Sequence, residues 1–356
     1  MLSKKWQKPC IQSFSNKMSD SVKTMIWVAL GFSLIATLLI MSVVHGSTPI
    51  SLQTTLQAFG QLFTTNENTM GPVYGIVVDL RLPRALLAIL VGAGLGVVGT
   101  LLQTTTKNNL ADPFLFGLSS GAAAGAVAVI TLGGDFLGIW TLPLASFIGG
   151  MTASGLVIIL VRRMANSGAE KLVLAGLAVS FVFTALTNYL IFSGDQRAAH
   201  SVLFWSLGGL GLARWDNLFL AIAGFAIVFG YALYNHRNFD ALLAGEHTAR
   251  TLGVDPVKQQ NLTFVVCAFS TAIFVSLTGI IGFIGLMVPH IARMLTGSLH
   301  KGLIVFSAIL GSIFLLGSDL IARVILIPQE LPVGIVTTSI GGVFVFFLLM
   351  KNSGSS

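Results

Sequence analysis

Long apolar runs separated by short polar segments make up most of the chain. A helix needs about 20 apolar residues to cross the hydrocarbon layer of a membrane. The first run, Met25–His45, is too long for the core of a signal peptide and lacks a small-residue cleavage site, so we expect a retained span. Further runs of about this length are Arg84–Gln103, Phe114–Leu132, Trp140–Val161, Leu172–Phe192, Asn217–Tyr234, Gly302–Asp319 and Gly334–Met350.

The apolar run from Leu262 to Pro289 is too long for one span and short for two. Lys258 precedes this run and Arg293 follows it, so both charges lie on one side only if the chain turns on the far side. We expect that turn near Thr278–Gly282, followed by a short returning helix at Phe283–Leu295. The pattern therefore predicts an all-α polytopic membrane protein with about ten transmembrane helices and both termini on the same side.

The polar segments divide the chain into one long membrane domain and two short tails. The expected parts are a basic N-terminal tail at 1–24, one transmembrane domain at 25–351 and a C-terminal tail at 352–356. The segment Gly46–Val78 is rich in Thr and Gln, with a candidate surface helix near Ser51–Phe63. Ser193–Asp216 is expected to be a mixed loop with its Trp residues at headgroup depth.

The composition agrees with a place in the bilayer. Charged residues make up only 9% of the chain and the mean hydropathy is +0.87, whereas soluble domains carry about 25% charged residues. The net charge of +7 does not indicate nucleic-acid binding, because no basic stripe with interleaved aromatic residues occurs. Cys10 and Cys267 lie far apart and predict neither a disulfide framework nor a metal site.

Basic residues divide unevenly between the two sides of this arrangement. The side of the N-terminus carries Lys4, Lys5, Lys8, Lys17, Lys23, Lys107, Arg162, Arg163, Lys171, Arg237, Arg250, Lys258, Arg293, Lys301 and Lys351, and the other side carries Arg81, Arg84, Arg197, Arg214 and Arg323. Fifteen of the 20 Lys and Arg residues therefore share one side. Because cytoplasmic loops are enriched in Lys and Arg, we expect both termini to be cytoplasmic.

One long polar stretch, Asn235–Gln260, interrupts the apolar chain on this cytoplasmic side. Asp240 is expected to cap a short helix that runs through Ala244 and is broken by Gly245, and Glu246–Leu252 is expected to form a second helix that ends at Gly253. Apolar faces would come from Leu242, Leu243, Ala249 and Leu252. The alternative is an amphipathic loop on the bilayer surface, but such loops are strongly basic, and the acids Asp240, Glu246 and Asp255 favour a protein partner.

Small residues recur every four positions in two of the expected spans. They are Gly92, Gly96 and Thr100 in the second span and Gly117, Gly121 and Gly125 in the third, a pattern typical of closely packed helices. Gly94, Gly96 and Gly99 also match G-x-G-x-x-G, but a dinucleotide site needs a strand before this motif, so we interpret them as packing residues. Ser119 lies in a G-x-S-x-G match that lacks His and acid partners at a useful spacing, so a membrane protease is the weaker alternative.

Charge inside the expected spans is scarce, with only Asp319 near a span end. Ion-coupled carriers usually bury acids or histidines along their path, so the scarcity argues against a secondary transporter, which remains the alternative from a different class. No G-x-x-x-x-G-K-[ST] phosphate loop occurs, so ATP hydrolysis by that route would have to come from a separate subunit.

Two further polar groups allow a functional and a structural interpretation. Arg81, Arg84 and Arg323 lie on the outer side, where they either anchor the helices beside acids or form a positive pocket for an external partner's carboxylates. The turn Asn108–Pro113 lies on the inner side. Asp112 before Pro113 suits a helix N-cap, and a role in closing the inner mouth of a pathway is additional.

Four stretches resemble the FecCD-type permeases, the ABC importer subunits for iron–siderophore, haem and cobalamin. They are RLPRALLAILVGAGLGVVGTLLQTTTKNNLADPFLFGLSSGA, LAGEHTARTLGV, GIIGFIGLMVPHIARML and ELPVGIVTTSIGGVFVFFLL, in the family's order over about residues 79–350. The resemblance implies a type II ABC importer permease bundle of ten helices, without catalytic residues, cofactor or metal of its own. It also implies a second permease subunit, two cytoplasmic ATP-binding subunits and a periplasmic or lipid-anchored substrate-binding protein.

The same resemblance assigns candidate site residues. Arg81, Arg84 and Arg323 match positions that meet glutamates of the binding protein. ATPase coupling would involve Asp240, Leu243, Gly245, Glu246, Ala249, Leu252 and Gly253. Asn108 and Leu110 match the cytoplasmic gate, although Asn109 stands where the family commonly has Pro, and the region of a second gate matches Asn166–Glu170.

The resemblance leaves the substrate open. Ferric siderophore is preferred because it is the common substrate of the family, with haem and cobalamin as alternatives. The expected location is the bacterial inner membrane.

Overall fold

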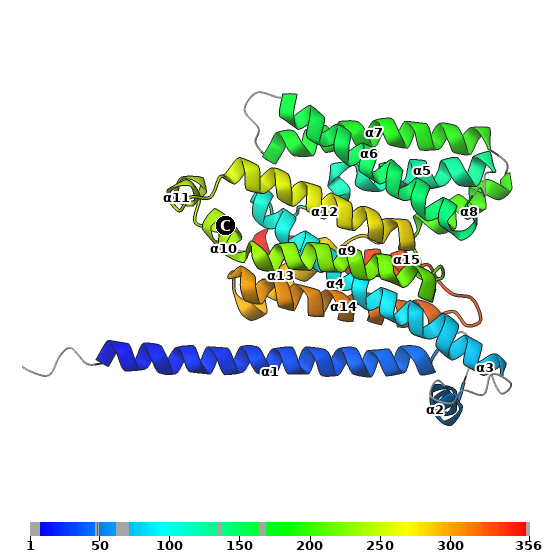
Figure 1. Ribbon diagram of the computed structural model, residues 1–356, viewed down its shortest axis with the longest axis horizontal. Helices are drawn as coiled ribbons and strands as arrows, with labels where there is room; N and C mark the ends of the chain where they lie inside the picture. Colours follow the sequence, from blue (N-terminus) through cyan, green and yellow to red (C-terminus); the bar gives the residue numbers. More distant parts are fainter. Residues whose placement is uncertain are drawn as a thin grey trace, which may run out of the picture.

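Each long apolar run of the sequence forms a helix in the computed structural model, which describes residues 8–46, 48, 50–61, 71–133, 137–163, 169–194 and 196–353. The long helices are α1 (Lys8–Val44), α4 (Leu82–Thr106), α5 (Leu118–Leu132), α6 (Thr141–Arg163), α7 (Ala169–Ser193), α9 (Trp215–Tyr234), α12 (Pro256–Thr278), α13 (Ile284–Thr296), α14 (His300–Val324) and α15 (Val333–Ser353). They lie side by side in one bundle (Figure 1).

Short helices connect the long ones. They are α2 (Leu52–Gln61), α3 (Pro72–Tyr74), the π-helix η2 (Gly75–Arg81), the 3₁₀ helices η3 (Pro113–Phe116) and η4 (Gly138–Trp140), α8 (Gln196–Ser206), α10 (His236–Leu243) and α11 (Glu246–Thr251). In the part of the chain that the structure describes, 7 helices are long and apolar enough to span a membrane, and three shorter apolar helices lie at Leu118–Leu132, Ile284–Thr296 and Val333–Leu348. Together they confirm the ten expected spans.

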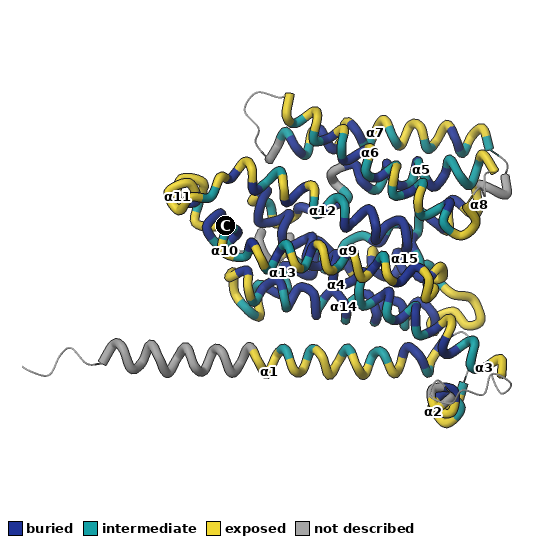
Figure 2. Tube along the Cα trace, viewed as in Figure 1, coloured by how far each residue is buried: buried dark blue, intermediate teal, exposed yellow. Residues whose placement is uncertain are grey.

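Helix α4 occupies the centre of the bundle. Of the most apolar stretch in Pro72–Thr106, 83% is buried, against 17% in Lys171–Ser193, which contains most of α7. Figure 2 shows the same contrast, with α4 and α14 mostly buried and one side of α7 exposed. The exposed faces carry large apolar side chains, such as Phe181 and Phe346, which suits contact with lipid chains.

The close packing of α4 depends on the small residues that the sequence pattern indicates. A Cβ atom on Gly92 would lie 2.3 Å from the carbonyl oxygen of Gly311 in α14, and one on Gly96 would lie 2.4 Å from that of Ser307. Thr100 Oγ1 donates to Ser307 Oγ over 2.8 Å, one turn further along. The small-residue face therefore lets the two backbones touch, and the packing interpretation is confirmed.

The turn and the short returning helix expected after Lys258 are both present. Helix α12 ends at Thr278, the chain turns through Gly279 and Phe283, which both have positive φ, and α13 returns from Ile284. Asp255 caps α12, because its Oδ1 accepts the backbone N–H groups of Val257 and Lys258 at 3.0 and 3.3 Å.

Three expectations about local structure are wrong. The segment before Arg84 is not entirely polar loop, because α3 and η2 extend α4 outward as buried Val77 and Val78 pack against the end of α1. The stretch 196–206, expected within a loop, forms α8. Asp240 does not cap its helix, since α10 begins four residues earlier, at His236, and the Asp240 carboxylate is used in a tertiary contact instead.

Candidate functional site

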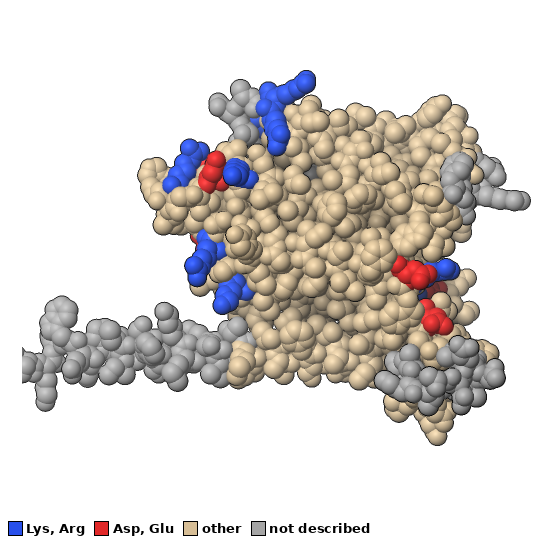
Figure 3. All heavy atoms as spheres, in the orientation of Figure 1, with Lys and Arg blue, Asp and Glu red and all other residues tan. Residues whose placement is uncertain are grey.

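One end of the bundle, hereafter the basic end, carries α10, α11 and the C-terminus (Figure 1). On the face seen in Figure 3, Lys and Arg gather at this end and the acids gather mainly at the opposite end. This separation agrees with the expected positive-inside arrangement, which predicts that the basic end faces the cytoplasm. The loop from α9 to α12 and the turn after α4 meet here.

The loop between α9 and α12 is folded and partly buried. Phe239, Leu242 and Ala249 are buried against the bundle, whereas Leu243 and Leu252 are 51% and 66% exposed. Two large apolar side chains are thus presented outward on α10 and after α11. Such an arrangement can dock into a groove of a partner on this side, with Ala249 acting inside the loop rather than at its surface.

Two glycines fix the ends of α11. Gly245 precedes the helix with φ 105°, and Gly253 follows it with φ 81°. After the helix, Gly253 donates its backbone N–H to Arg250 O over 3.0 Å and Val254 donates to Ala249 O over 2.9 Å. Only glycine adopts these backbone angles readily, so other residues at these two positions would change the path of the loop.

Glu246 and Asp240 connect this loop to the rest of the basic end. Glu246 Oε1 lies 3.0 Å from Lys107 Nζ, in an exposed ion pair with the residue that follows α4. Asp240 Oδ1 accepts the backbone N–H of His300 over 2.9 Å and lies 2.7 Å from His300 Nδ1. His300 was not among the residues indicated by the sequence, because its partners are distant along the chain.

The candidate gate lies in the turn between α4 and η3. Lys107 ends α4 with φ 51°, and Asn108 Oδ1 accepts the backbone N–H of Leu110 over 2.9 Å. Leu110 is 44% exposed and projects from the bundle. The structure thus places Asn108 and Leu110 next to the folded loop, joined to it through Lys107. Of the second candidate region, Asn166–Glu170, residues 166–168 lie outside the described residues.

Asp112 ends this turn and caps η3 as the sequence predicts. Its Oδ1 accepts the backbone N–H of Phe114 over 2.9 Å. Burial raises the pKa of its carboxyl to about 6, and the hydrogen bond from Phe114 opposes that shift. A buried carboxylate therefore lies beside the candidate gate.

We expect Asp112→Asn to stabilise the protein at neutral pH. The folded-state pKa of about 6 exceeds the ordinary value of 3.8, so the destabilisation by the buried carboxylate is complete above pH 6 and disappears below the ordinary value. At pH 7.5 the variant should gain about 2–3 kcal/mol in free energy of unfolding, equivalent to about two pKa units. The gain should shrink steadily as the pH falls towards 4. Unfolding in mixed detergent micelles at several pH values measures it.

Asp255→Asn is the matched control for Asp112→Asn, because it removes the carboxylate of an exposed N-cap at the same end of the bundle. A gain for Asp112→Asn that stays constant between pH 4 and 7.5 would show that ionisation of this carboxyl is not its cause.

The three outer arginines lie at the opposite end of the bundle, where each contacts other groups of the same chain. Arg323 is 2% exposed, with its Nε 3.0 Å from Asp319 Oδ2, and its Nη1 donates to Ser42 O over 2.9 Å. Arg81 is 6% exposed and donates to the carbonyls of Val43 and Val44 over 2.9 and 2.7 Å. Both arginines tie the end of α1 to the bundle.

Arg84 differs from the other two outer arginines because it also contacts an exposed acid. It forms ion pairs with Asp319 over 2.9 Å and with Glu330 over 2.6 Å, and its side chain is 14% exposed. The Glu330 side chain is 34% exposed. Since the anchoring contacts are in place, a role in docking requires that a partner's carboxylate replace or join Glu330 at Arg84.

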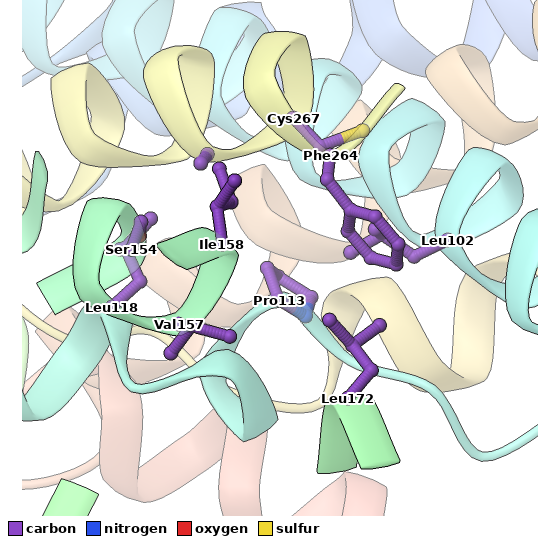
Figure 4. Close-up of a pocket in the computed structure, with 10 residues that line it drawn as sticks. Leu102, Pro113, Leu118, Ser154, Val157, Ile158, Leu172, Phe264 and Cys267 are labelled. Carbon is purple, nitrogen blue, oxygen red and sulfur yellow. The ribbon is translucent and has the colours of Figure 1, made fainter. Parts of the chain in front are cut away.

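One apolar cavity inside the bundle has room for little more than a water molecule (Figure 4). This cavity, of about 20 Å³, lies behind the gate turn and is lined by Leu102, Pro113, Leu118, Ser154, Val157, Ile158, Leu172, Phe264, Cys267 and Ala268. The Ser154 hydroxyl has no hydrogen-bond partner among the described atoms. A wider hollow of about 460 Å³ lies at the opposite end, between Trp140 and Arg214.

Comparisons with known proteins agree with this architecture. A model of the FecCD transport family matches residues 34–351. The vitamin B12 import system permease protein BtuC of Klebsiella pneumoniae is 33% identical over 84% of this chain and 86% of its own. The hemin transport system permease protein HmuU of Yersinia pestis is 33% identical over 80% and 86%.

A solved structure shares the fold. It is a metal-chelate type ABC transporter in an inward-facing conformation, similar with a TM-score of 0.76 at 27% sequence identity. The similarity covers 91% of this chain and 99% of that one. The arrangement of helices around α4 is therefore that of an ABC importer permease, and the expected fold class is confirmed.

Proposed function

This chain belongs to the FecCD transport family, and from that membership we propose that it is the permease through which a ferric siderophore enters a bacterial cell across the inner membrane. It is a multi-pass membrane protein and a permease subunit of an ABC importer rather than an enzyme. The likeness to a metal-chelate type transporter along nearly the whole chain supports a metal chelate as the substrate. Among these an iron–siderophore chelate is preferred because it is the common substrate of the family. The relatives that carry haem and vitamin B12 supply the alternatives.

A second permease subunit is part of the proposal. The apolar cavity behind the gate turn, about 20 Å³, is far smaller than any chelate, and the hollow of about 460 Å³ lies at the opposite end of the bundle. A path for substrate is therefore better formed between two subunits than through one. Two ATP-binding subunits would bind α10 and α11 at the basic end, where Leu243 and Leu252 are exposed, and a substrate-binding protein would dock at the opposite end. Asn108 and Leu110 would close the inner mouth.

ATP would drive transport by favouring one packing of this bundle over another. When the ATP-binding subunits close, the folded loop seated on them would move, and the bundle would change between outward-open and inward-open states. The contacts of the loop with Lys107 and His300 support this proposal, because they connect it to α4 at the centre of the bundle.

Reconstitution tests the function directly. The complex with its ATP-binding subunits is reconstituted into proteoliposomes, with the binding protein and a ferric hydroxamate outside. The ferric hydroxamate should enter the lumen only when the lumen contains ATP and the basic end faces it. Uptake driven by an ion gradient without an ATP-binding subunit would contradict the proposal. Binding of a ferric hydroxamate, haemin and cobalamin by the cognate binding protein separates the three substrate classes.

For the outer arginines, we expect opposite effects from two neutralising substitutions. Arg84→Gln removes the cation that a docking carboxylate would meet, whereas Glu330→Gln removes the internal acid that competes for it. Association of the binding protein at low salt should slow by about tenfold for Arg84→Gln and become faster for Glu330→Gln. Surface-immobilised complex measures both rates. Equal or unchanged rates in the two variants would show that Arg84 serves only as an internal anchor.

A further inference from the structure

A chain of hydrogen bonds through a buried histidine joins the folded loop at the basic end to helix α4. Asp240 in α10 contacts His300, the first residue of α14, through both its backbone N–H at 2.9 Å and its ring Nδ1 at 2.7 Å. On the other edge of the ring, His300 Nε2 lies 2.8 Å from Thr104 Oγ1 in the last turn of α4. His300 is 0% exposed, so its ring and the contact with Thr104 are shielded from water, whereas the Asp240 side chain is 28% exposed.

The chemistry of the three groups fixes the orientation of the ring. A carboxylate only accepts hydrogen bonds, so Nδ1 carries the hydrogen that points to Asp240. In the neutral ring Nε2 is then an acceptor, and the Thr104 hydroxyl, which lies 2.8 Å from Nε2 and 2.9 Å from Thr100 O, can donate to it. Phe239 of α10 packs 5.5 Å from the ring centroid. A displacement of α10 therefore cannot leave His300 in place without breaking buried contacts.

Two further contacts end on the same turn of α4. Glu246 in α11 pairs with Lys107, and Gln260 in α12 donates its Nε2–H to Thr105 O over 3.3 Å. The ion pair is more than half exposed and contributes little stability alone. All three contacts nevertheless converge on Thr104–Lys107, and the next residue, Asn108, begins the gate turn.

We propose that His300 is a positioning residue that transmits displacement of α10 to the last turn of α4 and so to the turn at Asn108 and Leu110. This inference rests on the proposed function, in which α10 and α11 bind the ATP-binding subunits. It adds His300 and Thr104 to the residues through which ATP binding acts on the gate.

A second polar group beneath α10 provides the matched control. Tyr231 Oη lies 2.8 Å from Thr263 Oγ1 and accepts from Gln259 Nε2 over 3.1 Å. These side chains belong to α9 and α12, and the hydrogen bonds between them do not reach α4. Removal of the Tyr231 hydroxyl thus perturbs the same layer of the bundle without interrupting the connection to the gate turn.

The experiment follows the gate turn in the full complex. Cys10→Ser with Asn109→Cys leaves one accessible thiol in this chain, because Cys267 is 1% exposed; the partner subunits are used in cysteine-free form. A membrane-impermeant maleimide is applied from the side of the basic end, with and without ATP and vanadate. The rate of labelling measures how accessible the gate turn is to the maleimide. The amount of trapped nucleotide measures nucleotide binding by the ATP-binding subunits separately.

The expected result is a nucleotide effect on labelling of about tenfold in the Asn109→Cys background and less than about twofold when His300→Leu is added. Trapped nucleotide should be unchanged, which a general loss of structure would not allow. Tyr231→Phe should keep the nucleotide effect. Thr104→Val should lose it and Thr104→Ser should restore it, so the test does not depend on the folding of one variant.

A His300→Leu complex whose labelling responds to nucleotide as the background does would overturn the inference. So would a background in which bound and hydrolysed ATP leaves the labelling rate unchanged. Failure of the ATP-binding subunits to bind the wild-type chain would instead contradict the proposed function itself, so the two failures are distinguishable.

Discussion

Gly99→Ala should strongly destabilise the bundle although it adds a single methyl group. The new Cβ would lie 1.9 Å from the carbonyl oxygen of Gly285 and 2.5 Å from its Cα, so the clash is with the backbone of α13 and no side chain can turn away to relieve it. Both residues are buried at the centre of the bundle. We expect a loss of about 3 kcal/mol or more in free energy of unfolding, the upper part of the range for overpacked cores.

Gly230→Ala is the matched control for Gly99→Ala. Gly230 is also inside a helix, α9, but it is exposed and has nothing within 4 Å of the position of its missing Cβ. Alanine there should be neutral or stabilising by up to about 1 kcal/mol through its higher helix propensity. Unfolding in mixed detergent micelles, with the yield of monodisperse protein, compares the two variants. Equal stability of the two would mean that α4 and α13 can separate at no cost.

The spans, their order and the glycine faces could be predicted because their signals are local and physical. A run of apolar residues has a length that can be compared with the membrane, and small residues at four-residue spacing lie on one side of a helix. Even the short helix α13 follows from two charges, Lys258 and Arg293, since a chain that leaves one side must return to it. Each of these inferences follows from the order of residues along the chain and needs no knowledge of tertiary contacts.

The missed features depend on contacts between distant segments. Arg81 is buried because its guanidinium donates to carbonyls 37 and 38 residues earlier, at the end of α1, and no local pattern distinguishes it from an exposed cation. His300 is 60 residues from Asp240 and 196 from Thr104. Asp240 itself resembles an N-cap in the sequence, yet its carboxylate makes a tertiary contact, and the helix starts earlier.

Gly253→Pro should disconnect ATP hydrolysis from transport. Gly253 has φ 81°, whereas proline requires a φ near −65°, so the substitution must change the path of the chain after α11. It also removes the backbone N–H that Gly253 donates to Arg250 O over 3.0 Å. With the end of α11 unwound, exposed Leu252 would move away from its proposed contact with the ATP-binding subunit. We expect uptake per ATP hydrolysed to fall by about tenfold or more, a coupling loss of ordinary size for a regulatory contact.

Gly133→Pro is the matched control for Gly253→Pro, because Gly133 has a similar backbone conformation at the opposite end of the bundle. Gly133 ends α5 with φ 70° and donates its N–H to Val129 O over 3.2 Å, so Gly133→Pro unwinds a helix terminus in the same manner. Binding of the ATP-binding subunits and the ratio of uptake to hydrolysis should stay near wild type in Gly133→Pro, and docking of the binding protein should stay intact in Gly253→Pro. A loop that transmits force at the basic end has no direct contact with a partner bound at the opposite end. If Gly253→Pro instead loses docking of the binding protein while its fold is preserved, α11 does not serve ATPase coupling.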